Sequence, residues 1–109
     1  MAETFKNAYL DVTTSETDLY TCPASTTAIV LTLRMTNVDG TNAATVDAKV
    51  LDSDSSTNSL IASTINVPAD STLELAGASK IVLEAGDKVQ LTASADNDIE
   101  AFASILEIT

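Results

Sequence analysis

Residues 26–37 read TTAIVLTLRMTN, and this stretch decides the class of fold. Its residues alternate with a period of two, the spacing that puts successive side chains on opposite faces of a β-strand. We therefore predict a strand whose core face carries the apolar set Ile29, Leu31, Leu33 and Met35. The residues between them, Val30, Thr32, Arg34 and Thr36, should face water or a partner.

The same period recurs along the chain. It places Val46 and Val50 inside a strand over residues 43–51, and Val89 and Leu91 inside one over residues 88–95. Further strands are predicted at residues 5–12, 19–22, 60–67, 72–75, 80–83 and 99–108. Turn formers separate the strands, among them Asp39-Gly40, which we expect to close a hairpin with a positive φ.

No segment has the 3.6-residue period of a helix. Eight or nine short strands at this spacing predict an all-β fold, an antiparallel β-sandwich of the jelly-roll kind. We expect one domain over residues 1–109, in which residues 1–18 are an arm or an edge strand used in assembly. The expected core is Ile29, Leu31, Leu33, Val46, Val50, Val89 and Leu91.

The last predicted strand, Ile99–Ile108, is apolar on both faces. One face carries Ile99, Ala101, Ala103 and Ile105, and the other carries Phe102, Leu106 and Ile108. A strand that is apolar on both faces is normally covered on both. The second cover is either a neighbouring subunit or a loop folded over a central strand. On the first interpretation, the interface residues are Ile99, Phe102, Leu106 and Ile108.

The charge balance excludes several partners. The chain of 109 residues has 5 Lys and Arg against 16 Asp and Glu, a formal net charge of -11. Such a surface repels nucleic acids and anionic membranes. With two Phe, two Tyr and no Trp, the core should be small and should depend on contacts between subunits. We expect a homo-oligomer, preferably a trimer.

The groups that most catalysis needs are missing. The chain has no histidine, which removes the common nucleophile systems and the usual general base. The single cysteine, Cys22, has no nearby Lys or Arg to stabilise a thiolate and is predicted to be a small buried side chain. The three glycines form no phosphate-binding loop. We expect neither an enzyme nor a cofactor.

Two acidic loops are weak candidates for a calcium site. Asp52 and Asp54 begin one loop like an oxygen-ligand motif, but Ser63 stands where that motif has its glutamate. Asp96 and Asp98 form the second loop. We predict that both are solvated turns and that the protein holds no metal.

The chain begins without a cationic segment leading into an apolar run. One cysteine cannot form an internal disulfide. We therefore expect folding in a reducing cytoplasm.

Several segments together resemble a family of small structural proteins encoded by tailed bacteriophages. They read LYTCPA at residues 19–24, NVDG at 37–40, VPADSTL at 67–73, IVLEAGDKV at 81–89 and SILEI at 104–108. The resemblance covers most of the chain from Leu19 onward.

This resemblance implies a virion protein, made in the host cytoplasm, whose partners are itself and the phage major capsid protein or other virion proteins. The first interpretation is a capsid decoration (cement) protein that stabilises the shell. The alternative is a tail, neck or fibre-associated module, structural or host-binding. No catalytic residue comes with the resemblance.

Overall fold

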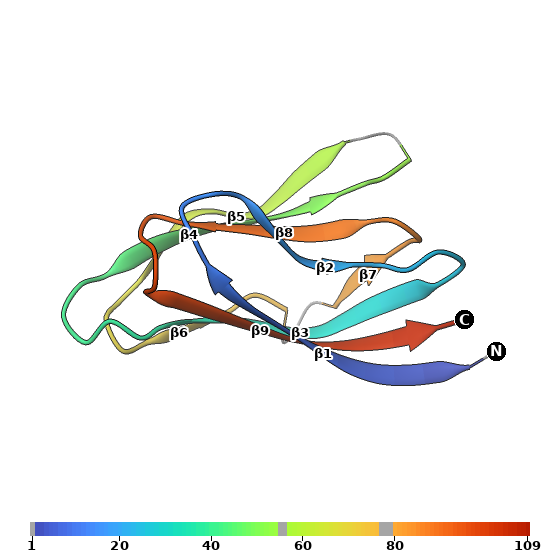
Figure 1. Cartoon of the computed structure of the whole chain (residues 1–109), viewed down its shortest axis with the longest axis horizontal. Coiled ribbons are helices and arrows are strands. Elements are labelled where there is room, and N and C mark those ends of the chain that lie inside the picture. Colours follow the sequence, from blue (N-terminus) through green and yellow to red (C-terminus); the bar gives the residue numbers. More distant parts are fainter. Residues whose placement is uncertain (1, 55–56, 77–79) are drawn as a thin grey trace.

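A computed structural model describes residues 2–54, 57–76 and 80–109. Within these residues the chain forms nine β-strands in two antiparallel sheets (Figure 1). The strands are β1 (Glu3–Val12), β2 (Thr17–Thr21), β3 (Thr27–Asn37), β4 (Ala44–Leu51), β5 (Asn58–Val67), β6 (Thr72–Glu74), β7 (Ile81–Leu83), β8 (Lys88–Ala93) and β9 (Ile99–Ile108). The described chain contains no helix, and so none long and apolar enough to cross a membrane.

The strand order is that of a jelly roll. Sheet A has the order β1-β9-β3-β6, with β7 also paired to β3, and sheet B has the order β2-β8-β4-β5. β6 and β7 pair with different parts of β3 and so share one position at the edge of sheet A. With these two counted as one interrupted strand, eight strand positions remain in two layers. The predicted antiparallel sandwich is confirmed.

One hydrophobic core lies between the sheets. Its largest fully buried side chains are Leu33, Met35, Leu83, Leu91, Ile99 and Ile105. Val46, Val89 and Leu91 are buried as predicted, and Val50 is half-buried and packs against the same cluster. Several smaller core positions are alanines on β4 and β9, so the two sheets approach with few bulky side chains between them.

A β-bulge in β3 overturns part of the predicted core. Val30 pairs with Ile105 of β9, but the next pair is Thr32 with Ser104, which leaves Leu31 as an extra residue. One extra residue reverses the faces of all that follow. Val30 therefore points inward before the bulge and Leu33 after it. The core assignments of Ile29 and Leu31 were wrong, and so was the outward assignment of Val30, because a strict period of two cannot reveal a bulge.

The hairpin predicted at Asp39-Gly40 was also wrong. This turn joins β3 in sheet A to β4 in sheet B, so the flanking strands are not paired with each other. Neither residue has a positive φ. Instead, Asp39 Oδ1 accepts the backbone N–H of Thr41 at 2.8 Å and of Asn42 at 3.2 Å. These two bonds lower the pKa of the Asp39 carboxyl below its ordinary value.

The position of the bulge can be tested by substituting Leu31 and Leu33, which are two residues apart in β3. Leu33→Ala should lower the free energy of unfolding by about 2–5 kcal/mol, because it empties a fully buried site. Leu31→Ala should lower it by less than about 1 kcal/mol, because Leu31 is only half-buried. Urea unfolding followed by circular dichroism measures both. Equal losses would place Leu31 in the core and contradict the bulge.

Candidate assembly surface

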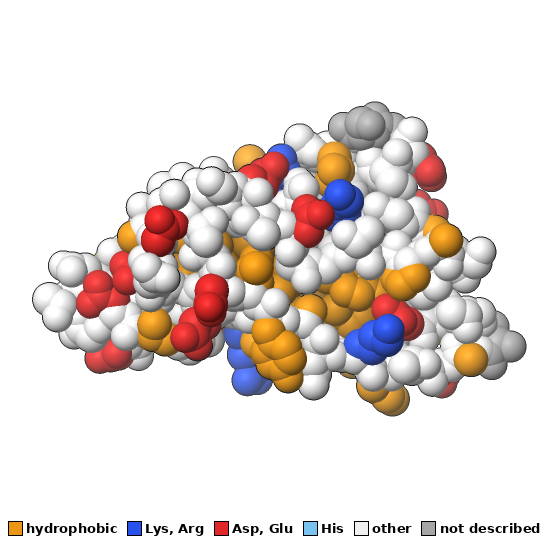
Figure 2. Space-filling model, viewed as in Figure 1, with side chains coloured by type: hydrophobic (Ala, Val, Ile, Leu, Met, Phe, Trp, Pro, Cys, Tyr) orange, Lys and Arg blue, Asp and Glu red, His pale blue; other side chains and the backbone are white. Residues whose placement is uncertain are grey.

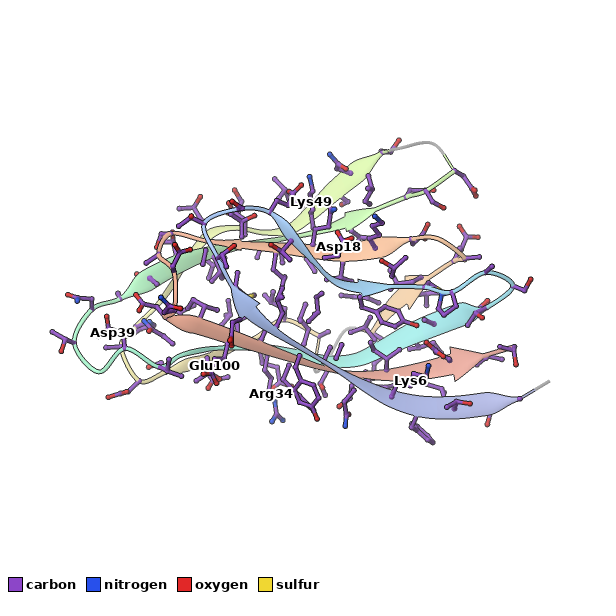
Figure 3. All side chains as sticks on the ribbon, in the orientation of Figure 1. Lys6, Asp18, Arg34, Asp39, Lys49 and Glu100 are labelled. Carbon is purple, nitrogen blue, oxygen red and sulfur yellow. The ribbon has the colours of Figure 1, made fainter. Side chains whose placement is uncertain are left out.

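The two outer faces of the sandwich differ in chemistry. The outer face of sheet B carries paired charges, and its edge strand β5 adds the exposed Leu60 beside Lys49. Lys49 Nζ lies 2.8 Å from Glu16 Oε2, and Lys88 Nζ lies 3.2 Å from Asp18 Oδ2. Gln90 Nε2 donates to Asp18 Oδ1 at 2.8 Å, and this bond is the main reason that the pKa of Asp18 is lowered. Figure 3 shows Lys49 and Asp18 on this upper sheet. Such a face is well suited to water.

The outer face of sheet A carries an apolar row across four strands. Phe5 of β1 pairs with Leu106 of β9, Leu106 with Ile29 of β3, and Ile29 with Val82 of β7. Paired residues in a sheet point to the same face, so the four side chains form one line. Phe5 is 75% exposed and Val82 is 61% exposed.

A second row crosses the same face, four residues further along β9. Tyr9 pairs with Phe102, and their ring centroids are 5.3 Å apart. The row continues into Arg34 of β3 and Glu74 of β6, where Arg34 Nε lies 3.6 Å from Glu74 Oε2. Three of the chain's four aromatic residues therefore lie on this one face.

We call this surface the apolar face; its members are Phe5, Tyr9, Ile29, Val82, Phe102, Leu106 and Ile108. In Figure 2, hydrophobic side chains project along the lower margin of the molecule, where Figure 1 places β1 and β9. Phe5, Tyr9 and Val82 stay largely exposed, so no described loop covers the face. The interpretation of a loop folded over β9 is therefore not supported.

The four interface residues predicted from the sequence do not all lie on one surface. Phe102, Leu106 and Ile108 lie together on the apolar face, each half-buried. Ile99 points the other way, into the core, and is only 1% exposed. It is therefore removed from the interface set, because its side chain is on the inward face of β9.

Four members of the apolar face were missed: Phe5, Tyr9, Ile29 and Val82. The spacing of Phe5 and Tyr9 does place them on one face of a strand. That this face continues the outer face of β9 depends on the pairing register, which the sequence does not reveal. Ile29 was assigned to the core because the bulge after it was not recognised.

A buried polar cluster fastens β1 and β2 to β9. Glu107 of β9 points between the sheets and is almost fully buried. It accepts a hydrogen bond from the Tyr20 hydroxyl of β2, and Lys6 Nζ of β1 lies 3.4 Å from its Oε1 atom. Burial, and next the bond to Glu107, raises the pKa of Tyr20 far above its ordinary value. The cluster connects the edge strands of both sheets through one carboxylate.

Cys22 is buried as predicted, with 1% of its surface exposed. Its thiol contacts two backbone oxygens, that of Thr26 at 3.3 Å and that of Leu83 at 3.7 Å. Burial is the main cause that raises the pKa of the thiol. In the folded state this sulfur cannot reach a neighbouring subunit.

The acidic loops are arranged as turns. Asp52 Oδ1 accepts the N–H of Asp54 at 2.8 Å, and Asp96 Oδ1 accepts the N–H of Thr14 at 2.9 Å. Asp98 accepts the N–H of Val38 through its backbone oxygen. Residues 55–56 of the first loop lie outside the described part of the chain. Among the residues that are described, no group of three or more acidic, cysteine or histidine side chains is placed to hold a metal ion.

No protein-family model matches the chain, and no curated protein matches it in sequence. Solved structures match its fold. A chain from the Bacillus endospore appendages, a family of disulfide-linked pili, is 16% identical with a TM-score of 0.55, over 99% of this chain and 87% of that one. A chain from the acid-stable capsid of the Helicobacter pylori bacteriophage KHP30 is 13% identical with a TM-score of 0.57, over 100% and 89%.

A chain from the T13 particle of infectious bursal disease virus is 7% identical with a TM-score of 0.59. That match covers 96% of this chain and only 30% of the viral one. At these identities the likeness shows a common fold. The fold is thus one that occurs in chains of viral capsids and of a pilus.

The Tyr20–Glu107 bond predicts a pH dependence. Tyr20→Phe should lower the free energy of unfolding at neutral pH by about 1–3 kcal/mol, because a buried carboxylate oxygen loses its donor. The pKa of Tyr20 is higher in the folded than in the unfolded state, where it is about 10. The stability that the neutral hydroxyl contributes is therefore complete below about pH 10 and falls as the pH rises above that value.

The difference in the free energy of unfolding between the wild type and Tyr20→Phe should accordingly become smaller as the pH rises above about 10. Tyr9→Phe is the matched control: its ring is 69% exposed, and its stability should stay within about 0.5 kcal/mol of the wild type. Denaturant unfolding at a series of pH values measures the differences. A Tyr20→Phe variant as stable as the wild type at every pH would contradict the role given to this bond.

Proposed function

We propose that this chain is a virion structural protein of a tailed bacteriophage, a capsid decoration (cement) protein that docks on the shell through its apolar face. The observation that carries the proposal is the contrast between the two outer faces. Sheet B turns paired charges outward, whereas sheet A exposes a continuous apolar row from Phe5 to Val82. Soluble monomers rarely keep such a patch unless it serves an interaction.

The fold and the resemblance support a role in assembly. Chains with this fold occur in a phage capsid, in a virus particle and in a pilus. The disulfide linkage of that pilus does not extend to this chain, because Cys22 is the only cysteine and is buried. Binding without catalysis suits a chain that has no histidine.

We propose further that the protein is a homotrimer in which β1 lies between subunits. β1 pairs with β9 without a bulge over ten residues, and its other side is a free edge. Ala2 and Thr109 exchange both backbone hydrogen bonds. Because bonded pairs alternate along an antiparallel ladder, the even-numbered residues of β1 bond to β9. The N–H and C=O groups of Phe5, Asn7 and Tyr9 therefore face the free edge, where strands of other chains can pair.

A second candidate function is a host-binding module at the tail, neck or fibre. The observation in its favour is that Phe5, Tyr9 and Phe102 gather on one face, since exposed aromatic rings also suit other ligands. The number of copies in a particle separates the two: hundreds indicate the shell, and about six to twelve indicate an axial site. Counting copies in images of the intact virion is the decisive observation.

Docking is tested with two exposed apolar side chains. Val82 lies in the apolar row, whereas Leu60 lies on β5 of sheet B and is 58% exposed. Val82→Asp should weaken binding to particles that lack the protein at least about tenfold, because it places an unpaired charge in the interface. Leu60→Asp should bind like the wild type. Co-sedimentation measures both, and equal binding by the two variants would remove the apolar face as the docking surface.

The trimer is tested at Asn7, whose N–H faces the free edge. Light scattering should give the wild type three times the chain mass of 11.3 kDa. Asn7→Pro should give a smaller assembly with unchanged circular dichroism, because proline removes one edge donor without touching the β9 ladder. Asn7→Ala keeps the donor and should remain a trimer. A wild type that runs as a monomer would end the oligomer proposal and leave the docking proposal standing.

A further inference from the structure

The apolar face ends in an acidic row. Asp11 of β1 pairs with Glu100 of β9, so two carboxylates stand directly opposite each other on the same face. Like charges in this position destabilise a sheet. No described ion pair involves either residue. Figure 3 shows Glu100 on the same lower sheet as Arg34.

Four of the chain's five cationic side chains lie beside described carboxylates. Arg34 lies on this outer face, beside Glu74. Lys6 lies against Glu107, Lys49 against Glu16, and Lys88 against Asp18. With a net charge of -11, a second copy of this chain would bring mostly further carboxylates to the acidic row, so charge complementarity favours a different partner with cationic side chains.

The space at the acidic row is suited to a cationic side chain. Asp11 and Glu100, together with Asn97 and Ile99, line a hollow of about 140 Å³. This volume equals that of about four or five water molecules. Successive rows on a strand face are about 7 Å apart, so the hollow lies one row beyond Tyr9 and Phe102. A partner that covers the two rings is thus in reach of the carboxylates.

We propose that the partner of the apolar face is a protein surface with an apolar centre and a Lys or Arg side chain at its rim, which enters the hollow between Asp11 and Glu100. This inference rests on the proposed docking function and names the partner's chemistry. The apolar rows supply the contact area, while the cation relieves the repulsion between the two carboxylates and fixes the orientation of docking.

The first experiment replaces one acidic residue by lysine, either in the acidic row or at a position outside the apolar face. Glu100→Lys should weaken co-sedimentation with particles at least tenfold and reduce its salt dependence. Asp54→Lys makes the same change in net charge at an exposed turn between β4 and β5 of sheet B and should bind like the wild type. Binding by Glu100→Lys that equals or exceeds the wild type would overturn the proposal. Self-association of the wild type that Val82→Asp abolishes would instead identify a second copy as the occupant.

A second experiment does not depend on particles. The probes are two short peptides, acetyl-Leu-Leu-Gly-Arg-amide and its counterpart ending in Glu, followed by NMR. The Arg peptide should shift the backbone signals of Phe102 and its neighbours in the wild type, the Glu peptide should not, and Glu100→Lys should reverse this preference. A wild type that ignores particles but prefers the Arg peptide would refute the decoration role alone. A wild type without any preference would refute the cationic partner.

Discussion

The pairing of β9 with β1 on one side and β3 on the other is the constraint on which the rest depends. β9 is paired over its whole length on both sides, so its two faces belong to two different environments. Its inward set, Ile99, Ala101, Ala103 and Ile105, forms the centre of the core. Its outward set cannot join that core, because alternate side chains of a strand point to opposite faces. The apolar face is a direct consequence of this one strand.

The period of two was enough to find the strands, because a strand that is buried on one face alternates apolar and polar side chains. It placed β9 at its observed bounds and the other strands within a few residues. The prediction of which β3 side chains face the core failed at Leu31, because this one unpaired residue exchanges the two faces of the strand. The apolar face was predicted only in part: Phe102, Leu106 and Ile108 follow from β9 alone, but Phe5 and Val82 join them through pairing registers that no local pattern encodes.

The acidity of the chain and its apolar face are compatible because they occupy different places. On sheet B the lysines lie beside carboxylates and form a hydrated surface. On the outer face of β1 and β9 the acidic residues lie at the strand ends, Glu3 beside Ile108 and Asp11 beside Glu100, and the centre of these two strands carries apolar and aromatic side chains. Net charge keeps free copies apart in solution, while the uncharged centre remains available for contact. The charged regions and the proposed docking surface are therefore separated in space.

β1 connects the two proposed interactions. Phe5 and Tyr9 turn their side chains to the apolar face, while their backbone N–H and C=O groups face the free edge. If a neighbouring subunit pairs with that edge, it restricts the backbone that carries the two rings. Lys6, between them, reaches into the sandwich toward Glu107, which also accepts the Tyr20 hydroxyl of sheet B. An edge strand held from inside in this way presents its rings in one position, so the proposed trimer would reduce the conformational entropy lost on docking.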